Sequence, residues 1–389
     1  MALDLTGTTG AVSPGSRILV WCDRADDAPR VAGLPLWRRA VYTACRAGFQ
    51  RLVLVAPKPA KLRAEINGDS HLAGRRLDVV GKGEPWIDSI GAEGGRWVVT
   101  GEEWVVDAEV LSSLAETDGR TAVVDDGPFA ASAEELALWT RGGWQPPAKP
   151  PTPVAERIAP PPVFVRVTDD ATAAAAEDAL FQGLARNVTN LFARYVDRPM
   201  SRAISRRLAP FPITPNQITI FSTLLGIVGS LVLLDPSYGA GVLGTFLFFS
   251  HTVIDGCDGE IARLKFQESA WGAKLDLIGD NVVHAFLFPC VALRLYFADP
   301  GGPYLLLGGA AFGGVIATWI VIYLLLVRST PSPAINRVFE AFANREFAYL
   351  VFFLGLIGRL DWFVWAMAFG LWAFPIGLVT VWLSERRRS

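Results

Sequence analysis

The chain has 389 residues, of which 51% are apolar and 19% are charged, and its mean hydropathy is +0.32. Hydropathy this high excludes a chain that is soluble throughout, and the length suggests two or three domains. The net charge of −2 is uninformative, because it averages a polar first half and a strongly apolar region after residue 213. The four cysteines form no CxxC pair, so we expect neither a disulfide framework nor a zinc site.

Residues 1–145 predict a soluble α/β domain. Two short apolar runs, 17–22 and 51–57, are typical of buried strands, and helical spacing between them predicts a helix over 34–48. A strand, a helix and a strand in this order predict a parallel pair. Further strands are expected at 77–80, 97–100 and 121–124.

Two segments of this domain resemble sugar nucleotidyltransferases, namely Val31-Ala-Gly-Leu-Pro-Leu36 and Trp97-Val-Val-Thr-Gly-Glu102. The resemblance implies a nucleotide site at the ends of the strands. The glycine-rich phosphate loop of that family is replaced here by Asp23-Arg-Ala-Asp-Asp27, and Glu102 stands where an aspartate is usual. Carboxylates in this loop repel phosphates that glycine backbone amides would bind. We therefore expect a degenerate, catalytically silent domain.

Prolines over 146–165 predict a semi-rigid linker. Residues 166–213 predict amphipathic juxtamembrane helices, because apolar residues recur at three- and four-residue spacing and six arginines lie between 186 and 208. An apolar face beside a basic face favours a helix lying on an anionic leaflet. The alternative is an ordinary helix packed on the soluble domain.

Residues 214–389 predict a membrane domain, opened by Thr214-Pro215-Asn216 as a helix start. A helix needs about 17–25 apolar residues to cross the bilayer core. The fifth candidate, Phe347–Ile357, is short and requires help from flanking residues 338–343. With it, the sequence predicts six transmembrane helices, over 218–234, 238–254, 277–298, 303–327, 347–357 and 362–383.

Basic residues indicate the orientation of these helices. Arginines and lysines gather before the first span, between the second and third, between the fourth and fifth, and after the last. The alternate loops 235–239 and 298–302 carry none. The positive-inside rule therefore places both termini on the cytosolic side of the inner (cytoplasmic) membrane. Residues 1–15 lack the pattern of a secretory signal.

Four carboxylates lie at defined spacing on the second and third expected spans. Asp255 and Asp258 are three residues apart and Asp276 and Asp280 are four apart, so each pair shares one helix face. Carboxylates at membrane depth are functional candidates. An all-oxygen set favours Mg²⁺, Mn²⁺ or Ca²⁺ over zinc.

The stretch 255–280 fits the pattern D-x2-D-G-x2-A-R-x8-G-x3-D-x3-D, and it resembles the signature of the CDP-alcohol phosphotransferase (CDP-alcohol phosphatidyltransferase) family. The resemblance implies that Asp255, Asp258 and Asp276 ligate two divalent ions, Mg²⁺ or Mn²⁺. It implies that Asp280 completes the metal site and takes the acceptor proton as general base. It further implies nucleotide contacts from Gly256, Gly259, Ala262, Arg263 and Gly272, with a site carboxylate as the alternative partner of Arg263.

Other polar residues nearby have plainer interpretations. His251 and His284 lie one helical turn before Asp255 and Asp280, where they could support the carboxylates, but packing is the favoured interpretation. Glu260 is expected to be solvated and Cys257 to be a small packing residue.

The resemblance implies a membrane enzyme that moves a substituted phosphate from a CDP-alcohol to an acceptor hydroxyl and releases CMP. The order of the two domains resembles fused inositol-1-phosphate cytidylyltransferase/di-myo-inositol-phosphate-phosphate synthases, which implies an inositol phosphate as acceptor and a soluble donor of the CDP-inositol type. A lipid donor, CDP-diacylglycerol, is the competing possibility. A homodimer is implied, and no nucleic acid is expected as a partner. Two alternatives stay open: a bifunctional enzyme whose first domain also makes the CDP-alcohol, and a non-catalytic anchor or cation transporter.

Overall fold

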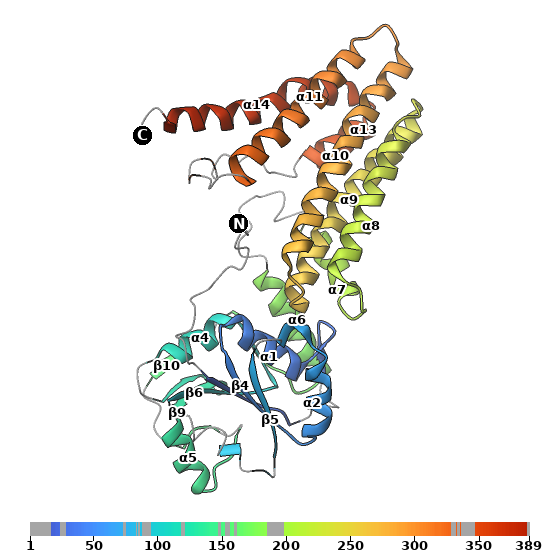
Figure 1. The fold of residues 1–389 in the computed structure, drawn as a ribbon. Helices are drawn as coiled ribbons and strands as arrows, with labels where there is room; N and C mark the ends of the chain where they lie inside the picture. Colours follow the sequence, from blue (N-terminus) through green and yellow to red (C-terminus); the bar gives the residue numbers. More distant parts are fainter. Residues whose placement is uncertain are drawn as a thin grey trace. The chain divides into compact units, whose positions relative to one another are not determined.

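The computed structural model describes residues 17–386, except for 24–28, 73–74, 83, 85, 88–94, 118–120, 147–148, 152–155, 159–161, 185–197, 328–331, 333–334 and 336–346. The chain forms two compact units (Figure 1). Unit 1 comprises Met1–Asn187, Ala209–Pro212 and Leu264–Phe266, and unit 2 comprises Val188–Leu208, Ile213–Arg263 and Gln267–Ser389.

Unit 1 is an α/β domain around a seven-stranded sheet of order β10-β8-β9-β6-β1-β4-β5. The central strand β1 pairs in parallel with β4 and β6, which confirms the predicted parallel pair. The predicted strands and first helix are also confirmed. The elements are β1 (Arg17–Trp21), β2 (Arg30–Val31), β3 (Leu34–Pro35), α1 (Leu36–Arg46), β4 (Arg51–Ala56), α2 (Pro59–Asn67), η1 (Ser70–Leu72), β5 (Arg76–Gly81), β6 (Arg96–Gly101), β7 (Trp104–Val106), α4 (Ala108–Glu116), β8 (Ala122–Val124), β9 (Phe129–Ser132), α5 (Ala133–Arg141), β10 (Glu156–Ile158), β11 (Phe164–Arg166) and α6 (Asp170–Gly183).

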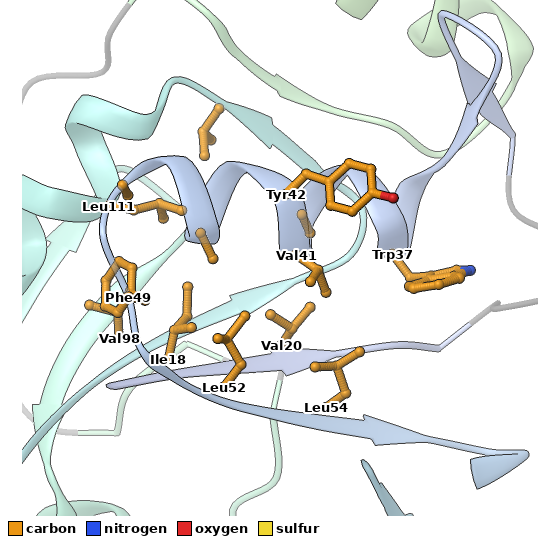
Figure 2. Packing of buried hydrophobic residues seen from close by; sticks show 14 of the residues in the cluster. Ile18, Val20, Trp37, Val41, Tyr42, Phe49, Leu52, Leu54, Val98 and Leu111 are labelled. Atoms are coloured by element: carbon orange, nitrogen blue, oxygen red, sulfur yellow. The ribbon is translucent and has the colours of Figure 1, made fainter. Parts of the chain in front are cut away.

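The sheet of unit 1 is buried on both faces. Alternate residues of β1 enter two different clusters, with Val20 packing under α1 and Leu19 packing on the opposite face beside Trp97. Figure 2 shows Trp37 and Val41 of α1 over the strands. Burial on both faces explains why β1 and β4 appear in the sequence as continuous apolar runs rather than alternating ones.

The structure extends unit 1 beyond the predicted boundary at 145. β10 lies within the expected linker 146–165, yet it pairs in parallel with β8 as the edge of the main sheet. The helix α6 was expected at the membrane surface, but its Ala173 and Ala176 pack on Val31 and Val105 of the α/β domain. A short segment between prolines is enough to form an edge strand, so the number of prolines in 146–165 did not predict the pairing of β10 with β8.

Unit 2 is helical and comprises α7 (Arg198–Leu208), α8 (Pro215–Val232), α9 (Tyr238–Lys265), α10 (Ala270–Ala298), α11 (Tyr304–Ile322), η3 (Tyr323–Val327), α13 (Phe347–Leu356) and α14 (Leu360–Arg386). Among the described residues, five helices are long and apolar enough to span a membrane: α8, α9, α10, α11 and α14. The predicted sixth span is not confirmed, because α13 has 10 residues. Its expected support, 338–343, lies outside the described residues.

Glycines allow the helices of unit 2 to approach closely. A Cβ on Gly279 of α10 would lie 2.4 Å from Thr223 Oγ1 of α8, and one on Gly226 of α8 would lie 2.7 Å from Val283 of α10. Small residues at such positions are the usual means of packing membrane helices. In Figure 1, α8 runs beside α10, and α11 runs beside α14.

Candidate metal and nucleotide site

The site begins with the first turn of α8. Thr214 caps this helix through a reciprocal pair with Gln217, and Pro215 occupies the first turn, as the sequence predicted. This fixed start places Thr219 and Ser222 three residues apart on one face of the helix.

Three carboxylates from two helices meet beside that face. Asp255 and Asp258 come from α9 and Asp276 comes from α10, and one oxygen of each lies within 4.8 Å of the others. Asp255 is 2% exposed. Negative charges this close repel one another unless a cation lies among them. The all-oxygen donor set therefore fits a hard divalent cation.

Hydroxyls from α8 hold two of these carboxylates in place. Thr219 Oγ1 donates to Asp258 Oδ2 at 2.5 Å, and Ser222 Oγ donates to Asp255 Oδ1 at 3.2 Å. Such donors fix the orientation of metal-ligating carboxylates. Sequence analysis did not identify either residue. The available signal was their spacing from the capped start of α8, but it could not show which face meets α9.

The fourth carboxylate, Asp280, is not part of this close group. It lies one helical turn further along α10, with its Oδ1 3.9 Å from His251 Nε2. His251 is buried, and its Nδ1 is 2.9 Å from the backbone oxygen of Ser222, which accepts the hydrogen bond. His251 is thus a buried ring with its own hydrogen bond, packed 5.9 Å from Phe248, as the favoured packing interpretation predicted, and Asp280 lies near it beyond hydrogen-bond distance.

His284 behaves as the packing interpretation predicted. Its ring contacts Phe347 and Phe288, with ring centroids 5.2 and 6.0 Å away. Cys257 is also confirmed as a packing residue, since it is fully buried and its thiol donates to the Ser201 backbone oxygen.

The residues expected to contact nucleotide lie on the last turns of α9 and the first turn of α10. Gly259 lies under the Arg263 guanidinium, because a Cβ there would be 3.3 Å from it. Gly272 lies beside Ser269, which caps α10, and a Cβ at Gly256 would make ordinary contact with Ser201. Ala262 lies on α9, three residues after Gly259. Gly256 lies between Asp255 and Asp258, whereas the other members lie nearer to the α9–α10 connection than the carboxylates do.

Glu260 differs from its expected solvated state. It is 1% exposed and is held by α7, where Ser201 Oγ donates to Glu260 Oε1 at 2.8 Å and Arg198 Nη1 lies 3.3 Å from the same oxygen. A buried carboxylate is stable only when it is paired and hydrogen-bonded. The arginine-rich helix α7 thus packs on α9 through Glu260, a contact that the sequence of α7 alone does not predict.

The strand ends of unit 1 are acidic. Glu102, which follows β6, is 2% exposed, and a Cβ on Gly101 would collide with the carboxylate of Glu103. Burial, with the negative charge of Glu102 second, raises the pKa of the nearby Cys22 thiol. Lys82 is paired with Asp23. The loop 24–28, where the nucleotidyltransferase resemblance departs most, lies outside the described residues.

These features define the class of the second unit. Its long apolar helices and the carboxylates inside them are those of an integral membrane protein with a polar intramembrane site. Residues 212–384 match the family model described as CDP-alcohol phosphatidyltransferase. The C-terminal part of this chain is therefore a domain of that transferase family.

Relatives of known name are similar to part of the chain. "Bifunctional IPC transferase and DIPP synthase" of Aquifex aeolicus is 30% identical over 128 residues, which cover 32% of this chain and 28% of that protein. The proteins of the same name from Archaeoglobus fulgidus and Thermococcus kodakarensis are 34% and 36% identical, over 26% and 23% of this chain and 20% of each relative. The chain thus matches less than a third of the length of these relatives.

Two solved structures are similar over part of the chain. HddC from Yersinia pseudotuberculosis is 10% identical, with a TM-score of 0.34, over 42% of this chain and 98% of HddC. A putative glucose-1-phosphate thymidylyltransferase from Bacillus anthracis is also 10% identical, with a TM-score of 0.33, over 45% of this chain and 97% of that one. Both TM-scores are low, so the description of unit 1 rests on its own sheet order.

Proposed function

We propose that this chain is a membrane CDP-alcohol phosphotransferase that moves a substituted phosphate from a CDP-alcohol to an acceptor hydroxyl and releases CMP. The observation that carries the proposal is the meeting of three carboxylates from α9 and α10 within 4.8 Å, inside a domain that matches this transferase family. In this proposal Asp255, Asp258 and Asp276 hold two divalent ions, Mg²⁺ or Mn²⁺.

When bound, the two ions would neutralise the pyrophosphate of the donor and stabilise the leaving CMP. The protein's own residues orient the carboxylates and deprotonate the acceptor hydroxyl. Thr219 and Ser222 fix the carboxylates, and Gly259 and Gly272 leave room for the nucleotide beside the helix backbone. Asp280 takes the proton of the acceptor hydroxyl as general base. The acceptor oxygen then bonds to the phosphorus that carries the alcohol, and the bond from that phosphorus to CMP breaks.

The test is CMP release by the purified full chain with CDP-diacylglycerol or CDP-inositol, Mg²⁺ or Mn²⁺, and a panel of alcohols. Asp255→Asn and Asp276→Asn should each lower turnover by about 10³-fold or more, because a site built for cation charge loses a ligand. Mn²⁺ binding, followed by electron paramagnetic resonance, should weaken in the same variants.

A matched control is Asp299→Asn, which changes an exposed carboxylate at the far end of α10 and should leave turnover and Mn²⁺ binding unchanged. Absence of CMP with every donor and acceptor would contradict the proposal and favour the anchor or cation-transporter alternative. Full activity in Asp280→Asn would remove that residue from its role.

Unit 1 is proposed to be silent rather than a second enzyme. Glu102 and Glu103 lie at the strand ends, and Lys82 is already paired with Asp23. Asp23 opens the segment that replaces the glycine-rich phosphate loop of nucleotidyltransferases, and its negative charge opposes the binding of a nucleoside triphosphate. The bifunctional alternative has support from the names of the relatives, and CTP turnover by the chain decides between the two.

We further propose that the cytosolic side holds both termini and α7, and that the chain works as a homodimer in the bilayer. The basic residues of α7 and the absence of basic residues from 235–239 support this orientation. A Ser237→Cys variant in intact cells should react with an impermeant maleimide from the outside, whereas a Ser269→Cys variant should not. Crosslinking in native membranes measures the dimer.

A further inference from the structure

Unit 2 contains a cavity of about 530 Å³ that opens onto two of the site carboxylates, Asp255 and Asp280. A volume of this size is typical of small-molecule sites. Its lining residues come from α9, α10, α11, α13 and α14.

The cavity lies on the opposite side of the carboxylates from the proposed nucleotide contacts. On α10 it begins at Leu277 and continues to Phe288, away from Gly272, and on α9 its residues precede Asp258. At 1.5 Å per residue, it follows α10 for roughly 12 Å beyond Asp280. A molecule in the cavity would thus approach the reacting phosphate from the side that the nucleotide leaves open.

The walls of the cavity differ in polarity. The wall from α9 and α10 carries the carboxylates, two histidines and Asn281, whereas the wall from α11, α13 and α14 is apolar apart from Thr318. Among the described lining residues there is no lysine or arginine. Phosphates are bound in proteins chiefly by such cations, and the carboxylates here would repel one. The walls complement a neutral hydroxyl group joined to an apolar body.

We propose that this cavity binds the acceptor, and that the acceptor is a neutral alcohol with a hydrocarbon body rather than a phosphorylated polyol. The proposal rests on the proposed function and names the acceptor class for it. The hydroxyl lies beside Asp280 and gives its proton to that carboxylate, its oxygen bonds to the donor phosphorus, and CMP leaves with the electrons of the broken bond. The hydrocarbon lies between α11 and α14.

Gly370 offers a way to fill the cavity without disturbing the fold. It lines the cavity on α14, and a Cβ built on it meets no atom within 4 Å. Gly377 lies two turns further along the same helix, also meets nothing within 4 Å, and does not line the cavity. Gly370→Leu and Gly377→Leu therefore have the same effect on helix propensity, and only the first blocks the cavity.

The first experiment compares acceptors in the CMP-release assay with the full chain, using dioctanoylglycerol and decanol against inositol monophosphate and glycerol phosphate. The enzyme should accept the neutral amphipathic alcohols as substrates. Gly370→Leu should raise the KM for these alcohols about tenfold or more, while the KM of the donor is unchanged. Gly377→Leu should match the wild type. Release of CMP with only the phosphorylated acceptors, or a change in the KM of the donor instead, would overturn the proposal.

The second experiment does not depend on turnover. A long-chain alcohol carrying a diazirine is photolysed with the detergent-solubilised chain in EDTA, and the labelled peptides are identified by mass spectrometry. Label should concentrate on 315–322 and 367–374, fall with excess decanol, and disappear in Gly370→Leu but not in Gly377→Leu. Label spread evenly over the apolar helices and equal in both variants would overturn the proposal, whether or not the chain releases CMP.

Discussion

The hydroxyl of Thr219 orients one of the site carboxylates. It donates to Asp258 Oδ2 at 2.5 Å, and it lies on α8, which contributes no carboxylate to the group of three. Thr219→Val keeps the shape and removes the donor. We expect divalent-ion affinity and turnover to fall about 10- to 100-fold, as for other residues that orient metal ligands. Mn²⁺ titration and CMP release measure the two effects.

Thr223→Val is the matched control for this prediction. Thr223 lies one turn further along α8, where its hydroxyl donates to the Thr219 backbone oxygen at 2.8 Å. The substitution is the same on the same helix. If both variants lose metal affinity equally, the effect comes from the packing of α8, and the orienting role of Thr219 is wrong.

Glu260 acts at the same scale but in the docking of α7. Its carboxylate is buried between Arg198 and Ser201, so Glu260→Ala leaves those polar groups without their acceptor. We expect a loss of about 1–3 kcal/mol in the attachment of α7 to α9. Trypsin should then cut at Arg202, Arg206 and Arg207 sooner than in the wild type, read by mass spectrometry.

Glu268→Ala provides the comparison, because Glu268 is exposed and follows the end of α9. It should leave the trypsin pattern unchanged. Equal cleavage of α7 in the wild type and in Glu260→Ala would show that this carboxylate does not hold the helix.

At the scale of elements, the contact between α8 and α10 sets the distance between the hydroxyls and the carboxylates. Gly279 lies between Asp276 and Asp280 on α10, and a Cβ on it would be 2.4 Å from Thr223 Oγ1. Gly279→Ala should therefore separate the helices, lower the midpoint of thermal unfolding, and reduce turnover more than about tenfold, because a shift near 1 Å misplaces reacting groups.

The second substitution Thr223→Ala tests the cause. With the hydroxyl gone, the nearest neighbours of the new Cβ are 3.7 and 3.8 Å away, which is ordinary contact. The double variant should regain most of the stability and turnover that Gly279→Ala loses. Gly309→Ala on α11, where a Cβ meets nothing within 4 Å, should be neutral. No recovery in the double variant would mean that the loss has another origin.

The sequence predicts elements well where a local pattern suffices. The capped start of α8 and the buried strands β1 and β4 are all confirmed, because each depends on neighbours in sequence. The linker was partly wrong, since β10 joins the sheet through pairing with β8, a contact that prolines around it do not reveal. Hydropathy located α13 correctly, because the predicted segment 347–357 and the helix Phe347–Leu356 nearly coincide, but its 10 residues do not confirm a sixth span.

The site divides in the same way. Spacing along α9 and α10 predicts which carboxylates share a helix face, and the structure brings Asp255, Asp258 and Asp276 together. It could not predict that Asp280 lies beside His251 instead, because that depends on how the two helices are rotated against each other. Thr219 and Ser222 come from a third helix, and only tertiary packing connects them to the carboxylates.

At the scale of the whole molecule, the open question is whether the chain contains one active centre or two. Unit 2 contains the three grouped carboxylates of Asp255, Asp258 and Asp276, whereas unit 1 has Glu102 and Glu103 at its strand ends. Asp23, shortly after β1, stands where nucleotidyltransferases have a glycine-rich phosphate loop, and a carboxylate there raises the free energy of a bound triphosphate. We therefore expect unit 1 to bind no CTP and to form no CDP-alcohol.

The decisive variant is the full chain with Asp255→Asn and Asp258→Asn, because any remaining nucleotide binding must then come from unit 1. Equilibrium dialysis with labelled CTP should show no saturable binding up to about 1 mM, which corresponds to less than about 4 kcal/mol of binding free energy. Pyrophosphate release with CTP and inositol monophosphate should stay at background. The wild-type chain should bind CDP in the same dialysis cell, which shows that the assay detects the site of unit 2. Saturable CTP binding or pyrophosphate release in the double variant would instead make the chain a bifunctional enzyme, with the acidic strand ends of unit 1 holding a cation for its own chemistry.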